Sequence, residues 1–79
     1  MKYYLTTIQY NKEAKAENRT VPKMYTELEK AEADFYAQVG ADMKNEKLGG
    51  SLNYVTNSEG GQYPSLNKKW GYMEEPIEE

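Results

Sequence analysis

The chain has 79 residues, among them eight tyrosines and one tryptophan, and it contains neither cysteine nor histidine. This length holds one domain, and the missing residue types exclude disulfides, thiol nucleophiles and an ordinary structural zinc site. A small domain without such links often depends on a partner for stability. The net charge is −3, and the mildly basic residues 1–25 carry too little positive charge to indicate binding to nucleic acid.

Residues 2–11 are rich in β-branched and aromatic side chains, which predicts a strand. Successive side chains of a strand point to opposite faces. The alternation places Tyr4, Thr6, Ile8 and Tyr10 on one face and Tyr3, Leu5, Thr7 and Gln9 on the other. Neither face is plainly polar, so we expect one face to pack against a helix and the other to stay exposed or to meet a partner.

Residues 12–25 are polar and charged, and Pro22 is incompatible with the interior of a regular helix or strand. We therefore predict a long loop over this range. Long ordered loops often carry binding residues, although a simply flexible connection would have the same composition.

Residues 26–46 have the pattern of an amphipathic helix. Thr26 and Glu29 fit a capping box, in which each side chain would satisfy a free backbone N–H of the other residue. An apolar stripe at helical spacing comprises Leu28, Ala31, Phe35, Val39 and Met43. We expect the acidic side chains on a solvated face of the helix, namely Glu27, Glu29, Glu32, Asp34, Asp42 and Glu46.

A second strand is predicted over residues 51–57 and a turn over residues 58–61. A third strand is expected from Gln62 towards Trp70 and Tyr72, with Pro64 confining it to a sheet edge or a bulge. The predicted fold is α+β in the order β-α-β-β, a small three-stranded and mostly antiparallel sheet with one helix packed on one face. We expect this domain to span residues 1–73 and residues 74–79 to be an acidic, flexible tail.

The residue types argue against catalysis. A serine or threonine nucleophile usually needs a histidine or lysine base, and the carboxylates fit a solvated helix face. The glycines near residue 60 lack the spacing of a phosphate-binding loop or of a calcium loop. We therefore predict no catalytic residue, no metal ligand and no cofactor, and a chain that is not an enzyme.

The aromatic side chains are the most prominent chemical feature. Tyrosine offers a large, rigid contact surface with a polar tip and is frequent in protein interfaces, but small sheets also use it as half-buried strand filler. The interface candidates are Tyr3, Tyr4, Leu5, Tyr10, Tyr54, Tyr63, Trp70 and Tyr72. The basic side chains that could hold an anionic ligand beside these rings are Arg19, Lys23, Lys68 and Lys69.

Several segments resemble those of short uncharacterised proteins from phage and prophage regions of gut Firmicutes. They are residues 3–12 and 16–23, the helical residues Phe35, Gln38, Asp42 and Met43, and the stretch from Leu48-Gly49 to residues 57–61. The resemblance implies a setting, either an accessory part of a virion or lysis module or an inhibitor of a host defence system. It implies no activity and no functional residues.

These observations favour a phage-type protein-binding module that acts through its tyrosine-rich surface, as a homodimer or with another protein. One alternative is a binder of a small anionic ligand such as a nucleotide. Another is an acidic mimic of nucleic acid that uses the helix carboxylates and the tail. The chain has no signal-peptide-like or membrane-spanning apolar run, so we expect a cytoplasmic protein without a membrane or nucleic-acid partner.

Overall fold

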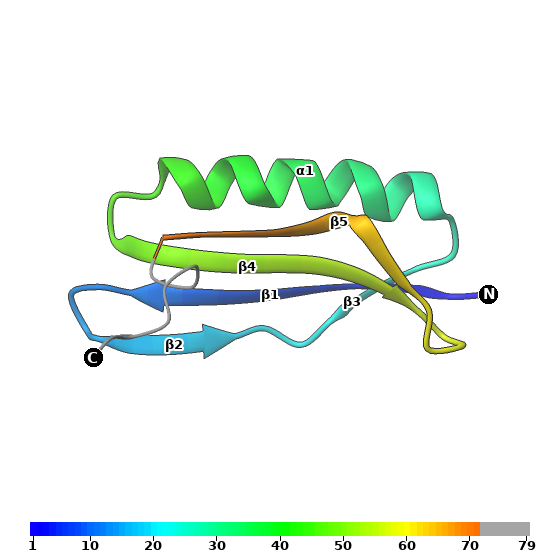
Figure 1. Ribbon diagram of the computed structural model, residues 1–79, viewed down its shortest axis with the longest axis horizontal. Helices are drawn as coiled ribbons and strands as arrows, with labels where there is room; N and C mark the ends of the chain where they lie inside the picture. The colour runs from blue at the N-terminus through cyan, green and yellow to red at the C-terminus, as the bar shows by residue number, and fades with distance from the viewer. Residues whose placement is uncertain (72–79) are drawn as a thin grey trace.

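The computed structural model describes residues 1–71, in which one helix packs on an antiparallel sheet (Figure 1). The elements are β1 (Tyr3–Asn11), β2 (Ala16–Arg19), β3 (Lys23–Tyr25), α1 (Leu28–Lys44), β4 (Leu48–Asn57) and β5 (Gln62–Gly71). The predicted α+β class is confirmed. The predicted three-stranded β-α-β-β arrangement is wrong, because the sheet has five strands. Tyr72 and the predicted tail over residues 74–79 lie outside the described residues.

The sheet is built around β1 and β4, which pair along the whole length of β1. The strand order is β2-β1-β4-β5, and β3 also pairs with β1. Because one side of β1 is occupied by β4, both β2 and β3 lie along its other side. Helix α1 connects β3 to β4 and runs across one face of this sheet (Figure 1).

The loop predicted over residues 12–25 is wrong, since this range contains β2 and β3. These two short strands form one edge of the sheet with a break at residues 20–22, which include Pro22. Thr20 still donates its backbone N–H to the backbone oxygen of Thr7 at 2.9 Å. Proline cannot donate to a strand partner, and a sheet edge tolerates this defect because only one side of the strand is paired.

Asparagine side chains organise both hairpin turns. Asn57 Oδ1 accepts the backbone N–H groups of Glu59 and Gly61 at 2.9 and 2.8 Å, and Gly60 adopts a φ of 84° that few other residues tolerate. Asn11 Oδ1 accepts two backbone N–H groups of the β1–β2 turn in the same way, at 2.9 Å each. The turn predicted over residues 58–61 lies where β4 connects to β5.

Helix α1 is shorter than predicted at both ends. Its N-cap is Glu27, which has extended backbone angles and makes no capping hydrogen bond through its side chain. The capping box predicted for Thr26 and Glu29 is therefore wrong. At the other end the chain leaves the helix at Asn45.

The buried face of α1 also differs from the predicted stripe. Ala31 and Phe35 are buried as expected, but the side chain of Met43 is 55 % exposed. Asp42 occupies the buried position instead, with 1 % of its surface exposed. The prediction that Asp42 belongs to a solvated face is wrong, and a polar cluster described below explains why.

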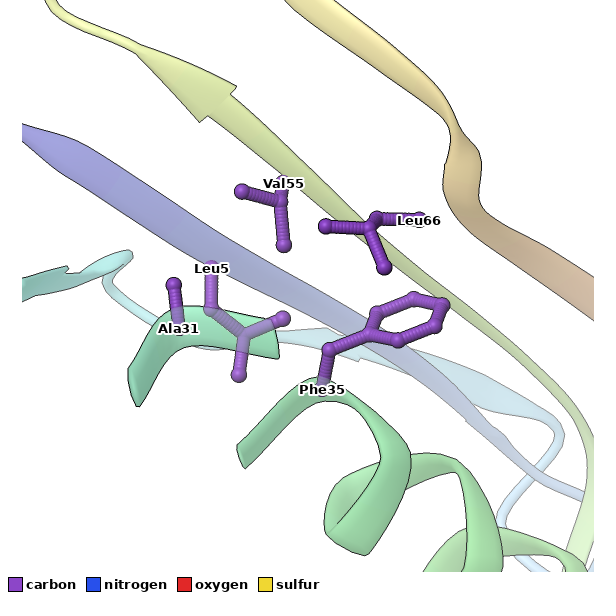
Figure 2. Packing of buried hydrophobic residues seen from close by; sticks show 5 residues of the cluster. All are labelled: Leu5, Ala31, Phe35, Val55 and Leu66. Atoms are coloured by element: carbon purple, nitrogen blue, oxygen red, sulfur yellow. The ribbon is translucent and has the colours of Figure 1, made fainter. Parts of the chain in front are cut away.

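The hydrophobic core lies between α1 and the three strands β1, β4 and β5. Figure 2 shows its five buried members converging from these elements: Leu5, Ala31, Phe35, Val55 and Leu66. Tyr3, Tyr25, Leu28, Val39 and Tyr63 pack around this cluster as partly buried side chains. Full burial of one large apolar side chain stabilises a fold by about 1.5–3 kcal/mol, so a core of this size supports one small domain and little more.

Candidate binding surface

The sheet has a second face, opposite α1, which we call the open face. In β1, Leu5 joins the core and Gln9 bonds to a side chain of α1, so the even-numbered residues of this strand point away from the helix. The division into two faces predicted for β1 is therefore confirmed. Within residues 1–71 no helix covers the open face (Figure 1).

The strand register arranges the open-face side chains in four rows across the sheet, because directly paired residues lie on the same face. The rows are Met24-Tyr4-Thr56-Gln62, Thr6-Tyr54-Asn67, Arg19-Ile8-Leu52-Lys69 and Glu17-Tyr10-Gly50-Gly71. Three tyrosines thus share this face with two cations at opposite edges.

Tyr10 lies over a glycine pair at one end of the open face. It pairs with Gly50, and a Cβ added to Gly49 would come within 3.0 Å of the Tyr10 ring. A side chain at residue 49 would therefore press on the ring, which would have to move by a few tenths of an ångström. The β1–β4 register shifts next to this contact, between Tyr10 and Asn11.

A recess opens at the other end of the sheet, where β5 parts from β4. Tyr54 pairs with Asn67 and Thr56 pairs with Gln62, so residues 63–66 lie opposite the single residue Val55. Pro64 lies within this bulge, in an edge strand as predicted. The recess has a volume of about 300 Å³ and is lined by Leu52, Tyr54, Val55, Thr56, Gln62, Tyr63, Pro64 and Asn67.

The structure divides the predicted interface residues between the two faces. Tyr4, Tyr10 and Tyr54 lie on the open face. Four others belong to the helix side: Tyr3, Leu5, Tyr63 and Trp70. Leu5 is only 3 % exposed and thus serves the core. Trp70 donates its indole N–H to Ser51 Oγ at 2.7 Å.

The four predicted anion-binding side chains do not converge. Arg19 and Lys69 share the open face but lie on opposite edge strands, three strand spacings or about 14 Å apart. Lys23 pairs with Leu5 and Lys68 with Asn53, which places both on the helix side. The structure therefore provides no single site in which these cations hold one small anion.

A buried polar cluster around Asp42 is the feature that sequence reasoning missed. Asp42 Oδ1 accepts the side-chain N–H groups of Gln9 and Gln38 at 2.7 and 2.8 Å. Asp42 Oδ2 accepts the side-chain N–H of Asn53 at 2.9 Å, and the hydroxyl of Thr7 donates to Asn53 Oδ1 at 2.7 Å. The i, i+4 spacing of Gln38 and Asp42 was the available signal for this cluster.

This cluster connects the helix to the two central strands and is closed to ligands. Asn53 is fully buried, and both carboxylate oxygens of Asp42 already accept amide N–H groups. Buried polar groups that are fully paired fix one packing arrangement, because any sliding of the helix would leave them unpaired. We therefore assign the Asp42 cluster a structural role.

Tyr25 of the edge strand β3 and Asp34 of α1 form a second polar contact between the sheet and the helix. The tyrosine hydroxyl donates to Asp34 Oδ2 at 2.7 Å. Burial, the hydrogen bond to Asp34 and its negative charge together raise the pKa of Tyr25 to about 12. This contact fastens β3 to the first half of the helix.

In residues 1–71 no cluster of three or more acidic side chains is placed to hold a metal ion. The helix in this range is also too short and too polar to cross a membrane. Comparisons with protein-family models, with curated proteins and with solved structures found no match to this chain.

Proposed function

We propose that this chain is a non-enzymatic protein-binding module whose contact surface is the open face of the sheet. The single observation that carries the proposal is a five-stranded sheet with α1 on one face and three tyrosines on the other. Antiparallel sheets tolerate a wet face, but wet faces are usually polar. The open face instead combines the half-buried rings of Tyr4, Tyr10 and Tyr54 with the half-buried side chain of Leu52, whereas Ile8 on the same face is only 5 % exposed.

Tyrosine is suited to this task because its two side-chain torsions lose little entropy on contact and its hydroxyl can bond at the rim. Tyr4 and Tyr54 are half-buried beside their neighbours in the sheet, so their rings are already held in place. A surface that is ordered before binding loses less entropy when the complex forms.

The proposed partner is a second copy of the chain or another protein. The resemblance to phage and prophage proteins favours an accessory phage protein or an inhibitor of a host system, acting in the host cytoplasm. An anionic ligand such as a nucleotide is less well supported, since the four candidate cations are spread over both faces and two edges.

Two matched sets of variants test the proposal. Tyr4→Ala and Tyr10→Ala remove rings from the open face outside the recess, whereas Tyr36→Ala removes an exposed ring from α1. Each tagged protein is used to capture partners from lysate of the source cell, and sedimentation equilibrium measures self-association. We expect the open-face variants to lose a captured protein or the dimer while Tyr36→Ala keeps it. Equal partner capture and equal self-association of all three variants would overturn the proposal.

A further inference from the structure

The recess beside β4 and β5 carries more information about the partner than the flat part of the open face. Its rim has four polar side chains, those of Tyr54, Thr56, Gln62 and Asn67. None of the four forms a hydrogen bond or ion pair with another residue in the described range 1–71. No side chain of residues 1–71 thus engages their hydroxyl and amide groups, and an amide offers a donor and an acceptor together.

The lining also has an apolar part, which the backbone holds in place. Leu52 comes from the paired strand β4, and Pro64 restricts the backbone of the bulge, whereas the side chain of Val55 points into the core and is only 1 % exposed. The hydroxyl of Tyr63 accepts a side-chain N–H of Asn57 at 3.0 Å, which holds the tyrosine at the back of the recess. The recess is thus a preformed hollow in which polar side chains surround the apolar surface of Leu52 and Pro64.

The charges around the recess define the second property of its ligand. No residue of the lining is charged, so the group that enters is neutral. The next open-face residue of β5 after Asn67 is Lys69. It belongs to the row Arg19-Ile8-Leu52-Lys69, in which Arg19 occupies the opposite edge of the sheet. Neither cation has a carboxylate within 4.0 Å in residues 1–71. The strand residues of the open face carry these two cations and one acid, Glu17, whereas the whole chain has a net charge of −3.

We propose that the recess holds one neutral aromatic side chain of a partner protein, a tyrosine or tryptophan, and that acidic residues flank this side chain in the partner. This inference rests on the proposed function and names the partner's chemistry. A volume of about 300 Å³ is at the lower limit of small-molecule pockets and suits a single ring system. The ring contacts Leu52 and Pro64, its polar atom meets the polar side chains of the lining, and the flanking carboxylates face Lys69 and, across the sheet, Arg19.

Residues Lys68 and Lys69 provide a matched pair for the test. They are adjacent in β5, both are exposed, and they point to opposite faces of the sheet. Lys68→Glu and Lys69→Glu change the net charge equally, so a difference between them reports the position of the charge. Asn67→Ala removes one amide from the rim without touching the core.

The probes are capped pentapeptides added to the full-length, ¹⁵N-labelled protein and followed by NMR. The sequences are Glu-Glu-Trp-Glu-Glu, the same peptide with Ala in place of Trp, and Gln-Gln-Trp-Gln-Gln; adenosine and uridine serve as neutral heterocycles. We expect the acidic Trp peptide to shift the backbone signals of residues 52–56 and 62–67. The Ala peptide and the Gln peptide should each bind about tenfold more weakly, as should Lys69→Glu and Asn67→Ala, while Lys68→Glu stays within about twofold of the wild type.

Three results would overturn the inference. One is the absence of signal shifts in residues 52–56 and 62–67 with the Trp peptide at millimolar concentration. Another is an equal response of Lys68→Glu and Lys69→Glu. The last is stronger binding of a nucleoside than of the Trp peptide, which would assign the recess to a nucleobase. Any of these leaves the proposed function standing if Tyr4→Ala and Tyr10→Ala still abolish partner capture, because neither residue lines the recess.

Discussion

Replacement of Asp42 by alanine tests the polar cluster that joins α1 to the sheet. The substitution removes the acceptor of three side-chain N–H groups, from Gln9, Gln38 and Asn53. Gln9 and Gln38 are partly exposed and can bond to water after the change. Asn53 is fully buried, so its side-chain N–H cannot bond to water after the change. The cost therefore falls mainly on one buried amide.

The magnitude follows from these exposures. A buried donor left without a partner costs about 1–3 kcal/mol, and a hydrogen bond that is replaced by water costs about 0.5–1.5 kcal/mol. Removing the buried carboxylate recovers part of its desolvation penalty. We expect a net loss of about 3 kcal/mol in the free energy of unfolding of Asp42→Ala, a large share of the roughly 4–12 kcal/mol typical for a domain of this length.

Urea unfolding followed by the fluorescence of the single tryptophan measures this loss, since Trp70 lies in β5 and bonds to Ser51 of β4. Asp34→Ala is the control, because it removes a carboxylate of the same helix whose hydrogen bond to Tyr25 is exposed to solvent. Asp42→Asn keeps the shape and should lose about half as much as Asp42→Ala, since one oxygen remains as an acceptor. A loss for Asp42→Ala no larger than that for Asp34→Ala would refute the structural role of the cluster.

Further predictions concern backbone freedom and alkaline pH. Gly40→Ala should stabilise the fold by about 0.5–1 kcal/mol and raise Tm by about 4 °C, because an added Cβ meets nothing within 4 Å in the helix. Gly71→Ala should destabilise it by about 2 kcal/mol in the same thermal assay, since its φ is 71° and an added Cβ would overlap the backbone of Gly49. The pKa of Tyr25 is about 12 in the fold against 10.0 for an ordinary tyrosine, so its neutral form contributes stability that is complete below pH 10 and is lost as the pH rises through 12. Tyr25→Phe should therefore lose less stability than the wild type over that interval, and equal slopes in alkaline urea titrations would contradict the assignment.

The elements that sequence reasoning predicted well are those with a strong apolar pattern. The alternation in β1 gave the correct two faces because Leu5 and Val55 meet Phe35 on one side. The helix was found for the same reason, through Ala31 and Phe35. Burial of apolar side chains leaves a periodic signal in the chain, and these elements carry it.

The elements that were missed carry no such signal. All residues of β2 are exposed, so this edge strand depends on backbone pairing with β1, and its composition is that of a loop. Asp42 was assigned to the surface because carboxylates are seldom buried without a charged partner. The side-chain N–H groups that donate to the Asp42 carboxylate come from β1, α1 and β4. A pattern along the sequence does not reveal that such distant segments meet. The recess was missed for a related reason, since it depends on the unequal lengths of β4 and β5 between two pairing points.

The strand order has a consequence for the rate of folding. The hairpins β1–β2 and β4–β5 are local and can form within about 1–10 μs, but the central pair β1–β4 joins residues 46 positions apart, such as Thr7 and Asn53. Neither hairpin alone contains the complete core, so the entropy of closing the intervening helix and loops is lost before most apolar contacts form. The slow step is then the meeting of the two hairpins beneath α1. Changes in the turns around Asn11 and Asn57 should alter this rate less than changes at the β1–β4 junction.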